Sequence, residues 1–243
     1  MLDSLFPCSF RFSMAEEGIA APTLTWTGEE PLETESSFAL DGMGEIPFTS
    51  VGKIEDWEVV LPSTSDRVCS EYNNYVFPLY EVVFKDMGFQ LPLSDFQREV
   101  LRWTKLSPSQ IHPNSYVFMR AFELVCQHLR VPPLKNLFYT IFTVQRGADW
   151  VSFRQTKKMF EIFTGKVQSF KERFFLVRPK SDAALDTLLE AAKEGVLECR
   201  TLFPLYWSQD HFGYELKDFC RTVPSLTEEE TDVHRKLPNV ETH

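Results

Sequence analysis

The sequence predicts an α+β fold: a mostly helical bundle with a small three-stranded antiparallel sheet and a disordered acidic N-terminal arm. Three observations predict it. Apolar residues recur with helical spacing between about residues 77 and 145, and they alternate with a period of two between 149 and 178. Most of the 22 Phe lie between Phe77 and Phe175, which places the core there. Residues 1–56 show no sustained period.

The charge distribution divides the chain into a basic centre and two acidic flanks. Residues 1–66 hold 13 acidic and 2 basic side chains, and their clearest disordered stretch is 29–37. Residues 67–180 are net +8, whereas residues 181–243 are net −7. We therefore expect a disordered arm over 1–66, one folded domain over 67–207, and a polar tail with a short helix over 208–243.

The first predicted elements precede the densest part of the core. Residues 54–61 are either a short strand or a docking segment. Gly88 is expected to end a helix that buries Tyr80, Val83, Phe84 and Met87, because Gly is favoured just after a helix. Pro78 and the pair Val82–Val83 suit an extended segment equally well.

A capping box predicts the next helix. Ser94 is followed three positions later by Gln97, so a helix should run from about Asp95 to Lys105. Its apolar spacing favours burial of Phe96, Val100, Leu101 and Trp103.

A rigid elbow is predicted to lead into the longest helix. Ser107 and Pro108 begin a short helical turn, and His112, which precedes a proline, ends it. Asn114 then serves as N-cap for a helix over 115–129. Its predicted buried stripe is Val117, Phe118, Ala121, Phe122, Val125 and Leu129.

The remaining elements follow from changes of period. A helix is expected over 134–143, with Leu134, Leu137, Phe138, Ile141 and Phe142 inward. The strands 150–154, 159–163 and 173–177 are expected to form one antiparallel sheet. Later elements are a helix over 182–193 that Ser181 caps and that buries Leu185, Leu188, Leu189 and Ala192, an apolar strap over 203–207, and a helix from Thr227.

Composition excludes several classes of protein. The five Cys (Cys8, Cys69, Cys126, Cys199 and Cys220) are widely spaced and never form C-x-x-C, so we expect reduced thiols rather than disulfides or a zinc site. No apolar run reaches the ~20 residues of a membrane span, and the N-terminus lacks the basic region of a signal peptide. We expect an intracellular protein of the cytoplasm or nucleus.

Four blocks carry a family resemblance. They are 80–96, then 106–122 (LSPSQIHPNSYVFMRAF), then 150–153, and 170–179, and the FPLYW at 203–207 is also similar. In this order they resemble the gypsy-type transposase domain of plants, found in proteins encoded by or derived from transposable elements. The resemblance implies that ancestry and a long variable C-terminal region, so this chain looks short for the family. It carries over no catalytic residues.

No catalytic constellation accompanies the resemblance. The sequence has no Asp-Thr/Ser-Gly of an aspartic protease, no Asp-Asp pair of a reverse transcriptase, no zinc knuckle and no phosphate-binding Gly-rich loop. The acids Asp95, Asp149 and Glu161 are the nearest to a DDE triad, yet a helix start, a loop and an antiparallel strand suit them better. Cys126 and His128 are on different faces of a helix and cannot form a metal pair.

The elbow is expected to be structural. It consists of Pro108, Gln110, His112, Pro113 and Asn114. His112 could act as a general base only with an orienting carboxylate and a nucleophile. We expect His112 and Gln110 to bond the elbow backbone instead, and Asn114 to cap the helix.

The basic centre is the positive signal for binding. Its cations are interleaved with Trp150, Phe153, Phe163, Phe174 and Phe175, and are Arg146, Arg154, Lys157, Lys158, Lys166, Lys171, Arg173, Arg178 and Lys180. Such a set either binds phosphates and bases or covers the solvated face of a sheet whose aromatics point inward. The acidic flanks could also fold over it and compete.

These observations give three hypotheses. The first is a non-enzymatic, transposable-element-derived domain, coat-protein-like and associating with RNA or DNA. The second is a protein–protein interaction or scaffold module that associates with itself or a partner. The third is a DNA transposase, as the family label implies, which the missing motifs disfavour. We expect no cofactor, no membrane and no small-molecule substrate.

Overall fold

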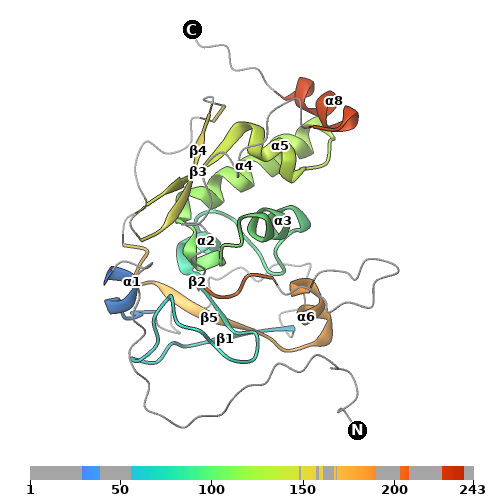
Figure 1. Cartoon of the computed structure of the whole chain (residues 1–243). Coiled ribbons are helices and arrows are strands. Elements are labelled where there is room, and N and C mark those ends of the chain that lie inside the picture. Colours follow the sequence, from blue (N-terminus) through green and yellow to red (C-terminus); the bar gives the residue numbers. More distant parts are fainter. Residues whose placement is uncertain are drawn as a thin grey trace.

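The structure, a computed structural model, describes residues 29–38, 56–147, 149–156, 159–160, 167, 169–189, 203–207 and 226–237. Within them helices accompany two small antiparallel sheets, which confirms the α+β class (Figure 1). The elements in chain order are α1 (Glu29–Glu33), β1 (Trp57–Val60), β2 (Phe77–Tyr80), α2 (Glu81–Lys85), α3 (Asp95–Thr104), the 3-10 helix η3 (Pro108–Gln110), α4 (Pro113–Leu129), α5 (Lys135–Ile141), β3 (Phe142–Arg146), β4 (Val151–Gln155), β5 (Phe174–Pro179), α6 (Asp182–Leu188) and α8 (Glu228–Lys236).

The three-stranded sheet has the order β1-β5-β2 and lies in the lower half of Figure 1. Central β5 is antiparallel to both neighbours, with Val177 opposite Val59 on one side and Phe77 on the other. Phe174 and Phe175 are fully buried because they point to opposite faces and both faces are covered. Pro78 is accommodated because β2 is an edge strand.

The second sheet is the hairpin β3–β4, which packs against α4. Val144 faces Phe153 across the hairpin, and both are buried. The expectation of one sheet over 149–178 is therefore wrong, since β4 pairs with a segment predicted as the end of a helix, and β5 pairs with residues before the elbow. Met159 and Phe160 are not in a strand, and the rest of 159–163 is outside the described residues.

The longest helix, α4, begins two residues earlier than predicted and buries a different stripe. Ser115, Tyr116, Met119, Phe122 and Cys126 are its buried residues after Pro113. The predicted stripe is half-buried except for Phe122, and most of it packs on the margin of the core. Apolar residues surround much of this helix because it is covered on more than one side, so counting them did not identify the innermost face.

Helices and strands share one core rather than forming a separate bundle and sheet. α2 follows β2 without a break, and α5 runs directly into β3. Phe138 is the centre of an aromatic cluster, with its ring centroid 4.4 to 5.5 Å from those of Phe96, Phe122, Tyr139, Phe142 and Phe153. The predicted helix over 134–143 was thus too long, because Phe142 is already extended.

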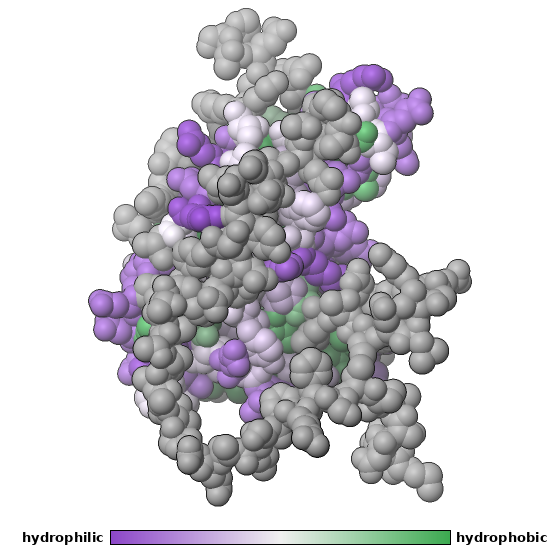
Figure 2. All heavy atoms as spheres, viewed as in Figure 1, coloured by the Kyte–Doolittle hydropathy of each residue, from purple (hydrophilic) through white to green (hydrophobic). Residues whose placement is uncertain are grey.

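Residues 29–38 and 56–66 correct the prediction of a disordered arm. Glu29–Glu33 form α1, Phe38 is buried, and residues 57–60 form the strand that was one of two alternatives. The other residues of 1–55 are outside the described part. Hydrophilic side chains cover α1 at the left and α8 at the upper right of Figure 2.

The C-terminal elements agree in part with the sequence. Ser181 caps α6 as expected, but the helix ends at Leu188, whose carbonyl accepts a bond from the Phe203 N–H. Within 203–207, Phe203, Leu205 and Trp207 are buried, as a closing strap requires. Thr227 and Glu230 form a capping box at the start of α8.

Candidate functional site

The candidate site is built around the elbow between α3 and α4, which buried hydrogen bonds hold in place. Ser107, Ser109 and Gln110 are fully buried around η3. The Ser109 carbonyl accepts a bond of 2.9 Å from the Tyr80 hydroxyl, and the Ser109 Oγ accepts one of 2.8 Å from Nε1 of Trp207. One residue of the elbow therefore connects the end of β2 to the C-terminal strap.

The same elbow holds the hairpin. The His112 N–H donates 2.8 Å to the carbonyl of Val151, and Ile111 forms a parallel bridge to that residue. Ser115 Oγ accepts a bond of 2.8 Å from the Phe153 N–H. The outer edge of β4 is thus paired with the elbow, and among the described residues β3 pairs with β4 alone.

His112 takes the capping role that the sequence assigned to Asn114. His112 is the N-cap, and its Nδ1 accepts from the Asn114 N–H at 3.2 Å. Pro113 occupies the first helical position, where its missing N–H costs no helical bond. Asn114 Oδ1 accepts instead from the Val167 N–H at 3.2 Å. The expectation of a structural His112 agrees with this geometry, and its ring also packs edge-on to Phe170 at 4.9 Å.

Three of the six described cations of the predicted basic centre are engaged in ion pairs. Lys171, Arg173 and Arg178 are ion-paired with Glu30, Glu81 and Glu58, respectively. Lys180 follows β5 and is exposed. Lys157, Lys158 and Lys166 are outside the described residues.

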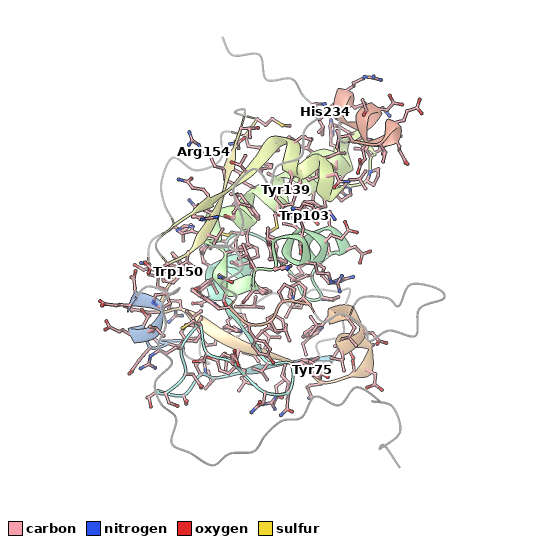
Figure 3. All side chains as sticks on the ribbon, in the orientation of Figure 1. Tyr75, Trp103, Tyr139, Trp150, Arg154 and His234 are labelled. Atoms are coloured by element: carbon pink, nitrogen blue, oxygen red, sulfur yellow. The ribbon has the colours of Figure 1, made fainter. Side chains whose placement is uncertain are left out.

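Arg146 and Arg154 are exposed on the hairpin, and neither is ion-paired within the part of the chain that the structure describes. The register places Arg154 opposite Thr143, and Arg146 opposite the inward-facing Val151. Because side chains alternate along a strand, the two arginines project from opposite faces of the hairpin. Figure 3 shows Arg154 at the outer side of β4, away from the helices.

Glu81 is a buried acid that pairs with two cations. Its carboxylate receives Arg173 Nε at 2.6 Å and Lys85 Nζ at 2.6 Å, and its side chain is 7% exposed. Burial would raise the pKa of Glu81, but the hydrogen bonds from Arg173 and Lys85 outweigh it and lower the pKa below its usual value. The pair fixes the start of β5 to the start of α2.

A groove of about 470 Å³ lies beside the N-terminus of α3. Its most buried acid is Glu123, which accepts Ser94 Oγ at 2.5 Å and Gln97 Nε2 at 2.8 Å. Ser94 at the same time caps α3, so the predicted capping box is confirmed. The carboxylate joins α3 to α4.

The three acids considered as metal ligands, Asp95, Asp149 and Glu161, differ in their surroundings. Asp95 pairs with Arg98 in the first turn of α3. Burial and the nearby Glu30 raise the pKa of Asp149, against the lowering effect of Lys171. Glu161 is outside the described residues. Over the described ranges, no three His, Cys, Asp or Glu side chains are grouped as metal ligands. The same ranges contain no helix long and apolar enough to cross a bilayer.

The sequence left open that an acidic flank folds over the basic centre, but it did not identify residues 29–38 as the segment that docks there. The signal was present: Phe38 follows an acidic segment whose charge complements the cations of 67–180. Low complexity concealed it, because Glu, Ser and Thr are typical of disorder.

Residues 80–146 match the model of a protein family described as "Putative gypsy type transposon". The match runs from the end of β2 to the end of β3 and includes the elbow. It confirms the resemblance for these residues, whereas the blocks at 150–153, 170–179 and 203–207 are outside it. No curated protein and no solved structure matches the chain.

Proposed function

We propose that this chain, whose residues 80–146 match a transposon family, is a non-enzymatic, coat-protein-like module that associates with RNA or DNA. The observation that carries the proposal is the state of the hairpin arginines. Arg146 and Arg154 are exposed without an ion pair among the described residues, whereas Lys171, Arg173 and Arg178 are paired with acids. Phosphates reach unpaired cations without breaking an existing ion pair.

The hairpin also has the chemistry of a strand-shaped nucleic-acid contact. Its outward face carries Thr143, Gln145, Ser152 and Arg154, all of which can bond phosphates or base edges. A two-stranded ribbon of this kind fits a major groove or lies along a single strand. In sequence the chain continues from β4 to Lys157, Lys158 and Lys166, which extend the positive charge.

The non-enzymatic part of the proposal is supported by the elbow. Its most reactive residue, His112, uses Nδ1 to cap α4. Ser109 is buried and accepts a bond from Trp207, and Ser115 is buried and accepts one from Phe153 of β4. The imidazole and both hydroxyls are thus used in structural hydrogen bonds, whereas a nucleophilic catalyst needs a hydroxyl or imidazole that can reach a substrate.

Fluorescence anisotropy with single-stranded and duplex oligonucleotides tests the proposal. We expect binding at about 50 mM salt that weakens steeply by about 200 mM, as counterion release requires. The double variant Arg146→Gln/Arg154→Gln should reduce the salt slope by about 1 to 2.

Arg178→Gln is the matched control, because it also removes one positive charge, but from a side chain that is already ion-paired with Glu58. It should leave the slope nearly unchanged. Absence of binding at low salt, or an equal effect of the control and of Arg154→Gln, would overturn the proposal.

A second candidate function is a protein-interaction scaffold. The observation that favours it is the docking of residues 29–38 on the body through ion pairs, backbone bonds and a buried Phe38. A protein that already binds a peptide segment on its surface has the means to bind one from another chain.

A further inference from the structure

Residues 29–38, called the acidic strap from here, lie against three cations of the body. Arg67 donates from Nε to the Leu32 carbonyl at 2.8 Å and pairs with Glu35 at 3.3 Å. Lys171 pairs with Glu30 while its Nζ stands 4.8 Å from the centre of the Trp150 ring. Figure 3 places Trp150 beside α1. Each cation is matched by an oxygen of the strap.

Arg173 completes this contact at the C-terminal end of the strap. Its Nη1 donates to the Ser37 carbonyl at 3.2 Å, and its guanidinium lies 5.8 Å from the centre of the Phe38 ring. Phe38 itself is buried against Phe175, with ring centroids 5.1 Å apart. An aromatic side chain therefore anchors the end of the acidic segment.

The body of the protein forms hydrogen bonds with the backbone of the acidic strap as well as with its side chains. The Ser37 N–H donates to the Glu172 carbonyl at 2.7 Å, and Ser36 Oγ donates to the Phe174 carbonyl at 2.5 Å. Backbone bonds, charge pairs and one aromatic anchor together describe a surface that recognises an acidic segment with a short helix, α1, at its start and Phe38 at its end.

The chain between the strap and β1 is long enough to reach another molecule. Residues 39–55 are 17 residues, which span at most about 60 Å when extended. The radius of gyration of a folded unit of this size is only about 15 Å. The covalent connection therefore does not restrict the strap to its own body.

We propose that the docking surface of one copy accepts the acidic strap of a second copy, so that two chains exchange straps and form a symmetric dimer. This inference rests on the proposed role as a binding module and names its partner. The strap makes the same contacts whether it docks on its own chain or on a second copy, so the ratio of monomer to exchanged dimer depends on the protein concentration. With an effective concentration of ~mM for the tethered strap, exchange becomes substantial where copies crowd together, as in a coat.

Crosslinking between isotopically distinct chains tests the proposal on the unmodified protein. Equal amounts of ¹⁴N- and ¹⁵N-labelled chain are equilibrated and treated with a carbodiimide, which joins contacting Lys and Glu side chains. Mass spectrometry then reads the Glu30–Lys171 crosslink. We expect mixed-label pairs whose fraction rises with protein concentration.

The internal control is the Glu81–Lys85 pair of α2, which must stay unmixed because both residues belong to one helix. Mixed labels at Glu30–Lys171 above this background support the exchange. Unmixed labels up to millimolar protein overturn it.

A variant gives the second measurement. Phe38→Ala should reduce the unmixed and the mixed-label Glu30–Lys171 crosslinks by the same factor, because it removes the anchor from the tethered contact and from the exchanged contact alike. Leu61→Ala, an exposed apolar residue, is the matched control and should leave both crosslinks unchanged. An equal effect of the two variants would contradict the role of the strap. Failure of the exchange leaves the nucleic-acid experiment intact, since Arg146 and Arg154 do not contact the strap.

Discussion

The indole Nε1–H of Trp150 donates a hydrogen bond of 2.7 Å to the phenolic oxygen of Tyr80, and both residues are buried. The same phenol donates to the carbonyl of Ser109 in the elbow. Trp150 immediately precedes β4 of the hairpin, and Tyr80 ends β2 of the other sheet. A short chain of bonds therefore connects the two sheets through residues that are far apart in sequence.

Removing the Tyr80 hydroxyl should destabilise the protein clearly. Tyr80→Phe leaves Trp150 Nε1 and the Ser109 carbonyl buried without their partner, which costs about 1–3 kcal/mol per unsatisfied group. Urea unfolding should show a loss of about 2–4 kcal/mol. Tyr75→Phe, at a half-buried tyrosine, is the control and should change stability by less than about 0.5 kcal/mol.

The observed face of α4 makes a second prediction. Met119 is fully buried and Val125 is half-buried, although the sequence favoured Val125 as a core position. Met119→Ala should cost about 2–5 kcal/mol, and Val125→Ala about 1 kcal/mol or less. The reverse order in chemical denaturation would show that the helix is rotated relative to this structure.

Stability should fall in acid through Glu81. Because its pKa is lowered in the folded protein, the contribution of Glu81 is complete above the unfolded value of about 4.3 and is lost as pH falls through the folded value. Glu81→Gln should therefore destabilise at pH 7 by about 1–2 kcal/mol and make the acid limb of a stability-versus-pH curve less steep.

Glu58→Gln is the comparison for this curve, since its pair with Arg178 is about two-fifths exposed on both sides. We expect a change in the free energy of unfolding at pH 7 of less than about 1 kcal/mol. Equal effects of the two variants would contradict the assigned role of Glu81.

The cap of α3 gives a fourth prediction. Ser94 Oγ accepts from the Gln97 N–H and donates to Glu123. Ser94→Ala should cost about 1–2 kcal/mol, because it removes a cap and one partner of a part-buried carboxylate. Ser94→Thr keeps the hydroxyl and should recover most of that loss in thermal unfolding; equal losses for both would argue against the cap.

Local signals in the sequence predicted local structure well. The capping box at Ser94, the N-cap at Ser181, the capping residue Thr227 and the turn at Pro108 are all confirmed. Each depends on residues within four positions of one another, so the chemistry is readable without the fold. Gly88 has a positive φ of +67°, but α2 ends earlier, at Lys85 with Asp86 as its C-cap, so Gly88 does not end this helix as predicted.

Strand pairing could not be read in the same way. β5 is paired with segments about 100 residues earlier in the chain, and nothing in its own sequence identifies those partners. The period of two showed that residues 173–177 form a strand, but it did not show which edges meet. Phe142 was assigned to a helix because a short apolar run has no clear period.

The candidate site was predictable only as composition. The basic residues were found, but their pairing with Glu30 and Glu58 of the acidic flank and with Glu81 of α2 depends on the tertiary structure around β5. The docking of the acidic strap could not be predicted from its hydrophobicity, because the segment is mostly polar and its aromatic anchor is a single residue, Phe38.

Native-state hydrogen exchange tests most directly the claim that the elbow unites helices and both sheets in one cooperative core. The amides of Val177 in β5 and Phe122 in α4 are buried in its two halves. We predict equal opening free energies for the two amides, lowered by the same amount in Tyr80→Phe. Unequal values, or a decrease confined to one half, would contradict the account.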